Sequence, residues 1–159
     1  MASIKELHKE FNKNTKMFIR DLVKVYPEQR FLKLIHTAYK LCKTLNRKLP
    51  QKYFNIYVGQ YSNYVFSKDD KFFGSGEIFT EFISVNKSFA GIDTFIIQEW
   101  PKLSDHNKEM VWKYLQVLCI LNKKYLDLSL DPKNQENDDM KDMKDMKDKD
   151  DSDDDSVIA

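Results

Sequence analysis

The chain has 159 residues, enough for one ordinary domain. Its formal net charge of +1 averages two unequal parts: residues 1–131 hold 21 basic and 14 acidic side chains, whereas residues 132–159 hold five Lys and eleven Asp or Glu. A charged N-terminus without an apolar core excludes a secretory signal, and no apolar run approaches the ~20 residues of a membrane span, so we expect an intracellular protein with no membrane contact.

The first sixty residues show helical periodicity. Between Ser3 and Tyr26 the apolar residues fall in one narrow arc at 100° per residue, which predicts one long helix. A second helix is predicted from Glu28 to Leu45, and a third from Pro50 to about Tyr61. The residues expected to face inward on the second helix are Phe31, Leu34, Ile35, Ala38, Leu41, Cys42 and Leu45. Those of the third are Tyr53, Phe54, Tyr57 and Val58.

The second half of the domain is less regular. Residues 62–91 are rich in aromatic residues and broken by glycines, which indicates a loop with a short helix over Glu77 to Ser84. Asp93 is the expected N-cap of a helix that runs through Trp100. A last helix begins at Ser104 or Asp105 and runs to about Tyr125, and it is apolar over more than half its circumference.

These elements predict an all-α fold: a single bundle of about six helices, over residues 1–131, packed on a central hydrophobic C-terminal helix. Residues 132–159 are expected to form an acidic disordered tail, because they hold too few apolar groups to offset chain entropy. Ser152 precedes three aspartates, the context of a possible phosphosite for acidophilic kinases. Cys42 and Cys119 are expected to be buried thiols rather than a disulfide.

The most informative surface feature is a series of basic residues opposite the apolar arc of the first helix. The second helix repeats the arrangement more loosely. This pattern is typical either of a solvated lysine-rich face or of a binding surface for an anion, which could be nucleic acid, an acidic protein or the chain's own tail. The abundance of Lys over Arg argues against base-specific readout. The candidate residues are Lys5, Lys9, Lys13, Lys16, Arg20, Lys24, Lys33, Lys40, Lys43 and Arg47.

A second candidate surface is aromatic, and it consists of Tyr57, Tyr61, Tyr64 and Phe66. These side chains could contact a partner protein or could belong to the core. The histidines have no ligand partners at metal-binding spacing, and the Gly74–Gly76 segment lacks the lysine of a phosphate loop. We therefore expect no metal, no cofactor and no enzymatic activity.

Two segments, "FNKNTKMFIRDLVKVYPE" and "EWPKLSDHNKEMVWKYLQVLCIL", resemble an uncharacterised all-helical protein family of large eukaryotic (nucleocytoplasmic) DNA viruses. The resemblance covers about 40 residues. It implies an all-helical viral protein, in the virion or in the host cytoplasm or nucleus, without a known activity.

The leading functional interpretation is a non-enzymatic helical interaction module, a viral structural or host-interaction protein with a viral or host protein as its partner. Its acidic tail would fold back and mask the basic helix faces. The alternative is a nucleic-acid or chromatin binder of low specificity, whose Lys5–Lys24 stripe contacts phosphates under control of the tail. A third possibility is that the bundle mimics a host helical regulator with a groove that accepts an amphipathic helix.

Overall fold

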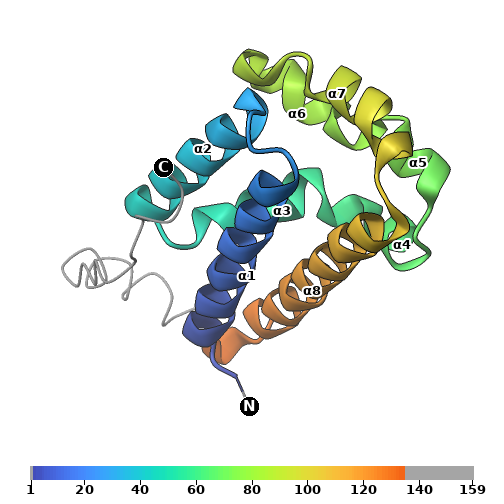
Figure 1. The fold of residues 1–159 in the computed structure, drawn as a ribbon. Helices are drawn as coiled ribbons and strands as arrows, with labels where there is room; N and C mark the ends of the chain where they lie inside the picture. The colour runs from blue at the N-terminus through green and yellow to red at the C-terminus, as the bar shows by residue number, and fades with distance from the viewer. Residues whose placement is uncertain (1, 135–159) are drawn as a thin grey trace.

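The computed structural model describes residues 2–134, and this part of the chain is helical throughout, without a strand (Figure 1). The all-α prediction is confirmed. The α-helices are α1 (Ile4–Val25), α2 (Arg30–Leu45), α3 (Leu49–Tyr57), α4 (Ser62–Phe66), α5 (Asp70–Gly74), α6 (Thr80–Val85), α7 (Ile92–Glu99) and α8 (Asp105–Ser129). Short 3₁₀ helices cover Gly59–Tyr61, Glu77–Phe79, Lys87–Phe89 and Trp100–Lys102. The tail prediction falls on residues 135–159, which lie outside the described residues, as does Ser152.

The two longest helices, α1 and α8, run antiparallel side by side through the molecule (Figure 1). The N-cap of each helix is a serine. The Ser3 hydroxyl accepts a hydrogen bond from the Glu6 amide in a capping box, and the Ser104 hydroxyl accepts one from the Asn107 amide. A ring stack and a hydrogen bond join α1 to α8. Phe18 stacks on Tyr114 at 5.0 Å between ring centroids, and the Tyr114 hydroxyl donates to Asp21 at 2.6 Å.

That hydrogen bond also sets the ionisation of the tyrosine. Burial, followed by the bond to the Asp21 carboxylate, raises the pKa of Tyr114 to about 12. The hydroxyl therefore keeps its proton, and its role as donor to α1, over the whole neutral range.

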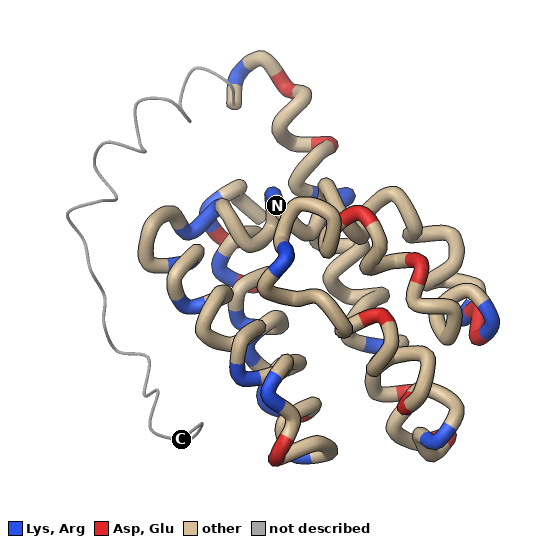
Figure 2. The backbone as a smooth tube through the Cα atoms, turned by 90° about the horizontal axis from the view of Figure 1, so that it is seen from above, with Lys and Arg blue, Asp and Glu red and all other residues tan. Residues whose placement is uncertain are grey.

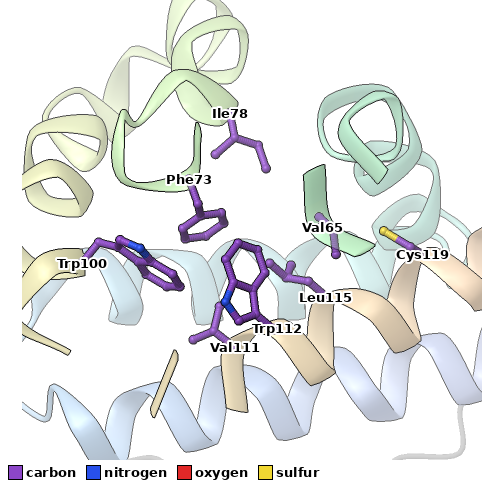
Figure 3. Packing of buried hydrophobic residues seen from close by; sticks show 8 residues of the cluster. All are labelled: Val65, Phe73, Ile78, Trp100, Val111, Trp112, Leu115 and Cys119. Atoms are coloured by element: carbon purple, nitrogen blue, oxygen red, sulfur yellow. The ribbon is translucent and has the colours of Figure 1, made fainter. Parts of the chain in front are cut away.

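A buried hydrophobic cluster lies between α8, α4, α5 and the 3₁₀ helices Glu77–Phe79 and Trp100–Lys102. Phe73, Trp100 and Trp112 contact one another, with ring centroids 4.4 to 5.3 Å apart (Figure 3). The Trp100 indole nitrogen donates to Asp70 at 2.9 Å, and the Lys108 ammonium donates to the same carboxylate at 3.1 Å. The bonds from Lys108 and Trp100 lower the pKa of Asp70 and join α5 to α8.

The prediction for residues 62–91 was wrong in part, because the segment forms a series of short helices instead of a loop. Two glycines provide the turns between them: Gly76 has φ 71° and Gly91 has φ 97°, a region that L-residues rarely adopt. Gly91 is also the N-cap of α7, two residues before the predicted cap, so Asp93 lies inside the first turn. The expected helix over Glu77 to Ser84 is present as a 3₁₀ turn followed by α6.

α8 packs against α1, α3 and α4, and it buries Trp112, Leu115 and Leu118. Its central position is confirmed, although Val117 and Ile120 on another side are exposed.

Among the described residues, no helix is both long and apolar enough to cross a membrane. Both cysteines are free thiols: Cys119 is buried, which raises its pKa to about 11, and Cys42 is half-buried, which also raises its pKa.

Candidate interaction surface on the first two helices

α2 does not face the core in the way that its periodicity predicts. Its buried residues are Leu32, His36 and Tyr39. The Tyr39 hydroxyl donates to the main-chain carbonyl of Asn12 at 2.8 Å, and the Asn12 side chain donates to the carbonyl of Arg47 at 3.0 Å. These bonds hold one side of α2 against α1.

As a result, three leucines that were predicted to face inward are exposed to solvent. The exposed fractions are 40% for Leu34, 60% for Leu41 and 61% for Leu45. Sequence periodicity shows which side of a helix is apolar, but it does not predict which distant residue a buried hydroxyl or amide will hydrogen-bond. Here the hydrogen bonds of Tyr39 and Asn12 accompany a rotation of the helix away from its most apolar side.

Leu34, Ala38, Leu41 and Leu45, which we call the α2 strip, follow one side of the helix at spacings of four, three and four residues. At 1.5 Å per residue the strip is about 16 Å long. Single exposed leucines are ordinary on protein surfaces, whereas a contiguous apolar patch marks an interaction site more often. The strip is therefore a candidate interaction surface.

The border of the strip is positively charged along one flank, while Phe31, Ile35 and Cys42 lie along the other. At 100° per residue, Arg30, Lys33 and Lys40 lie along one flank of the strip, and Arg47 follows the end of the helix. Lys33 and Arg47 are exposed, and Lys40 and Lys43 are half-buried. α2 contains no acidic residue.

The predicted basic stripe lies on α1, which packs against α2. Lys5, Lys9, Lys13 and Lys24 are exposed, whereas Lys16 and Arg20 are half-buried. Lys24 pairs with Asp21 on the same helix at 3.5 Å. The stripe is thus largely accessible to solvent.

Charge is unevenly distributed over the described chain. Residues 2–57 hold thirteen Lys and Arg against four Asp and Glu, whereas residues 58–134 hold nine against ten. Figure 2 shows an excess of basic positions on one side of the molecule, whereas basic and acidic positions are mixed on the other. The α2 strip therefore lies in the positive half of the domain.

The candidate aromatic surface is divided between packing and solvent. Tyr57 and Tyr61 are half-buried, in ring contact with Phe82 and Phe72 respectively at 5.2 Å. Tyr64 stacks on Phe72 at 3.9 Å and is 42% exposed, and Phe66 is 49% exposed. The predicted inner face of the third helix is confirmed in part: Phe54 and Val58 pack against the core cluster, whereas Tyr53 is exposed and Gln51 is buried. The helix ends at Tyr57 rather than at about Tyr61.

A separate apolar cavity of about 90 Å³ lies behind the N-terminal half of α2, where Tyr26, Phe31 and Phe95 meet. Burial and the Glu99 carboxylate raise the pKa of Tyr26 at this cavity. Ligand pockets usually measure about 300–1,000 Å³, so the cavity is too small to accept a helix. The α2 strip lies open on the surface rather than in a groove.

Sequence reasoning found the basic residues but assigned the apolar residues of the strip to the core. The only sequence signal for the strip was the length of the apolar arc on α2, which a buried face also produces.

In residues 2–134, no cluster of three or more His, Cys, Asp or Glu could hold a metal ion. Asp69 caps α5 by accepting a hydrogen bond from the Phe72 amide at 2.9 Å. The absence of enzymatic activity stays a prediction.

Comparison with family models, with curated proteins and with solved structures found no match to this chain.

Proposed function

We propose that the protein is a non-enzymatic helical interaction module that binds an acidic, amphipathic segment of a partner protein on the α2 strip. The observation that carries this proposal is the exposure of Leu34, Leu41 and Leu45 beside a positively charged flank of α2. A viral structural or host-interaction role is part of the proposal, and it rests on the resemblance of the two sequence segments described above.

The chemistry of the strip favours this class of partner over others. Burying exposed leucine side chains is worth roughly 25 cal/mol per Å², and this supplies affinity without requiring a particular sequence. The Lys and Arg border adds attraction to carboxylates and repels basic segments, which gives selectivity and a faster encounter. A strip about 16 Å long matches three turns of a helix, so the partner needs apolar residues at i, i+3, i+4 and i+7.

The first test is fluorescence anisotropy with a labelled model peptide. The peptide carries leucines at i, i+3, i+4 and i+7 and glutamates elsewhere, and it is titrated into the full-length chain. We expect saturable binding that weakens as salt rises. The double variant Leu41→Ser, Leu45→Ser should bind at least about tenfold more weakly, since about 1.4 kcal/mol of lost apolar burial corresponds to a factor of ten.

The matched control is Val85→Ser, which removes an exposed apolar side chain from α6 and should leave affinity unchanged. Unaltered affinity in the Leu41→Ser, Leu45→Ser variant would contradict the α2 strip as the binding site. Absence of binding in every chain would contradict the proposed function itself.

A second candidate function is binding of nucleic acid through phosphate contacts, and the observation that favours it is the concentration of basic residues on α1 and α2. The contacts would come from the Lys5–Lys24 stripe and would carry little sequence information. The apolar residues of the strip have no role in this function, so the Leu41→Ser, Leu45→Ser variant separates the two candidates.

A further inference from the structure

We propose that the chain's own C-terminal segment, residues 135–159, occupies the α2 strip and competes there with the external partner. This inference rests on the proposed function, because it assigns an occupant to the same surface. It goes beyond a general attraction between an acidic tail and a basic domain, since it names the apolar strip as the contact and three methionines as its anchors.

The segment has the chemistry that the strip requires. Residues 135–159 contain eleven Asp and Glu against four Lys, a charge opposite to that of the α2 border. Met140, Met143 and Met146 recur every third residue, and an aspartate stands one position before each of them. Methionine is unbranched and polarizable and adapts well to an irregular apolar surface.

The described chain ends close enough to α2 for this contact. α8 ends at Ser129, and the Asn134 side chain donates to the Leu128 carbonyl at 3.0 Å, which holds residue 134 beside the end of the helix. Near that end of α8, the ring centroids of Tyr125 and His8 are 4.7 Å apart, which places the start of α1 there. One turn further along α1, the Asn12 side chain donates to the main-chain carbonyl of Arg47, which follows the C-terminal end of α2.

One turn of α8, from Tyr125 to Ser129, and one turn of α1, from His8 to Asn12, thus separate the exit of the C-terminal segment from the C-terminal end of α2. The 25 residues from 135 to 159 span up to about 80 Å when extended, at roughly 3.3 Å per residue. The strip itself is about 16 Å long. The segment can therefore cover the whole strip without straining its attachment.

Charge alone would not select the strip over the α1 stripe, since the border of the strip and the α1 stripe both carry lysines. The α1 stripe offers ammonium groups, whereas the α2 strip offers leucines with a basic border. A segment that alternates Met with Asp and Lys gains apolar burial on the α2 strip and not on the α1 stripe, so the methionines favour the strip as the place of contact.

Tethering makes even a weak contact effective. A segment held by a short flexible linker has an effective concentration of about a millimolar, so a dissociation constant of about 50 µM in trans would leave the strip mostly covered and would weaken partner binding by roughly twentyfold. Only a partner that binds more tightly, or a change in the segment, would then open the surface.

Cys42 provides a reporter that is already in the chain. It is half-buried on α2, one turn from both Ala38 and Leu45, while the buried Cys119 is an internal control. We would measure the rate of maleimide labelling of Cys42 in the full-length chain. The comparison is with a full-length variant carrying Met140→Ser, Met143→Ser and Met146→Ser, which keeps every charge.

We expect Cys42 to react at least about fivefold faster in the triple-serine variant, with no change at Cys119. The protection should be independent of protein concentration. Equal Cys42 rates in the two chains would overturn the inference. Protection that grows with protein concentration would also overturn it, because the segment of a second chain would then be the occupant.

A peptide titration separates failure of this inference from failure of the proposed function. A labelled peptide of residues 135–159 should bind the triple-serine variant at least about tenfold more tightly than it binds the wild-type chain. If the leucine–glutamate model peptide binds both chains equally and the 135–159 peptide binds neither, the proposed function stands and the inference fails. If neither peptide binds either chain, both fail.

Discussion

At the scale of single residues, three amide side chains hold α3 against α8. Gln51 donates to the Asn122 side-chain oxygen, and Asn122 donates to Asn55 at 2.9 Å. Gln51 and Asn122 are both buried, so each depends on the other for hydrogen bonds that water would otherwise supply. Gly59 leaves room for this group: a Cβ there would lie 3.1 Å from the Asn122 amide nitrogen and 3.2 Å from the Asn55 oxygen.

We predict that Asn122→Leu destabilises the protein by about 1–3 kcal/mol, because it leaves the buried Gln51 amide without its acceptor. Urea unfolding followed by circular dichroism measures the difference. The neighbouring exposed position supplies the control, since Lys123→Leu should change stability by less than about 0.5 kcal/mol. Equal effects at the two positions would show that the amide group does not contribute to stability.

At the scale of elements, the local signals for α1 and α8 were strong enough to be read directly. Ser3 and Glu6 form a capping box that starts α1, and Ser104 caps α8 as expected. Both signals act within one turn of the helix, so they need no knowledge of the rest of the fold. The rotation of α2 carried no such signal, because it depends on Asn12, which lies 27 residues from Tyr39 in the sequence.

The rotation of α2 predicts opposite results for two leucines on the same helix. Leu32→Ala should destabilise the protein by about 2–5 kcal/mol, since Leu32 is buried. Leu41→Ser should cost less than about 1 kcal/mol, because Leu41 is mostly exposed. Urea unfolding of the two variants tests this, and a larger loss for Leu41→Ser would place the predicted apolar face back in the core.

At the scale of the whole molecule, the folded chain separates charge into two halves. The basic side chains of α1, α2 and α3 come together because these helices pack on one another, while the segments from Gly59 onward are close to neutral. Such a distribution produces a field that steers anionic partners toward one side, and salt weakens it. Peptide binding on the α2 strip and phosphate binding by the α1 stripe would both use this field.

If the α1 stripe contacts phosphates, a labelled DNA duplex of about 30 base pairs should bind at about 50 mM salt and lose most of its affinity by about 200 mM. Fluorescence anisotropy with the full-length chain measures both values. The variant Lys5→Glu, Lys9→Glu, Lys13→Glu should abolish binding, whereas Lys71→Glu, Lys87→Glu, Lys102→Glu in the other half should reduce it only slightly. Equal losses in the two variants would exclude the stripe as the contact.

The sequence by itself determined the helical class, the extent of α1, the cap of α8 and the basic side chains of α1, because periodicity, capping and charge are properties of neighbouring residues. The tertiary structure decided how α2 is turned, that Gln51 of α3 is buried, that residues 62–89 form short helices instead of a loop, and that Leu34, Leu41 and Leu45 are exposed. These features depend on contacts between residues far apart in the chain. Tyr39 reaches the Asn12 carbonyl and Gln51 reaches Asn122, and a buried polar group takes the orientation in which its hydrogen bonds are made.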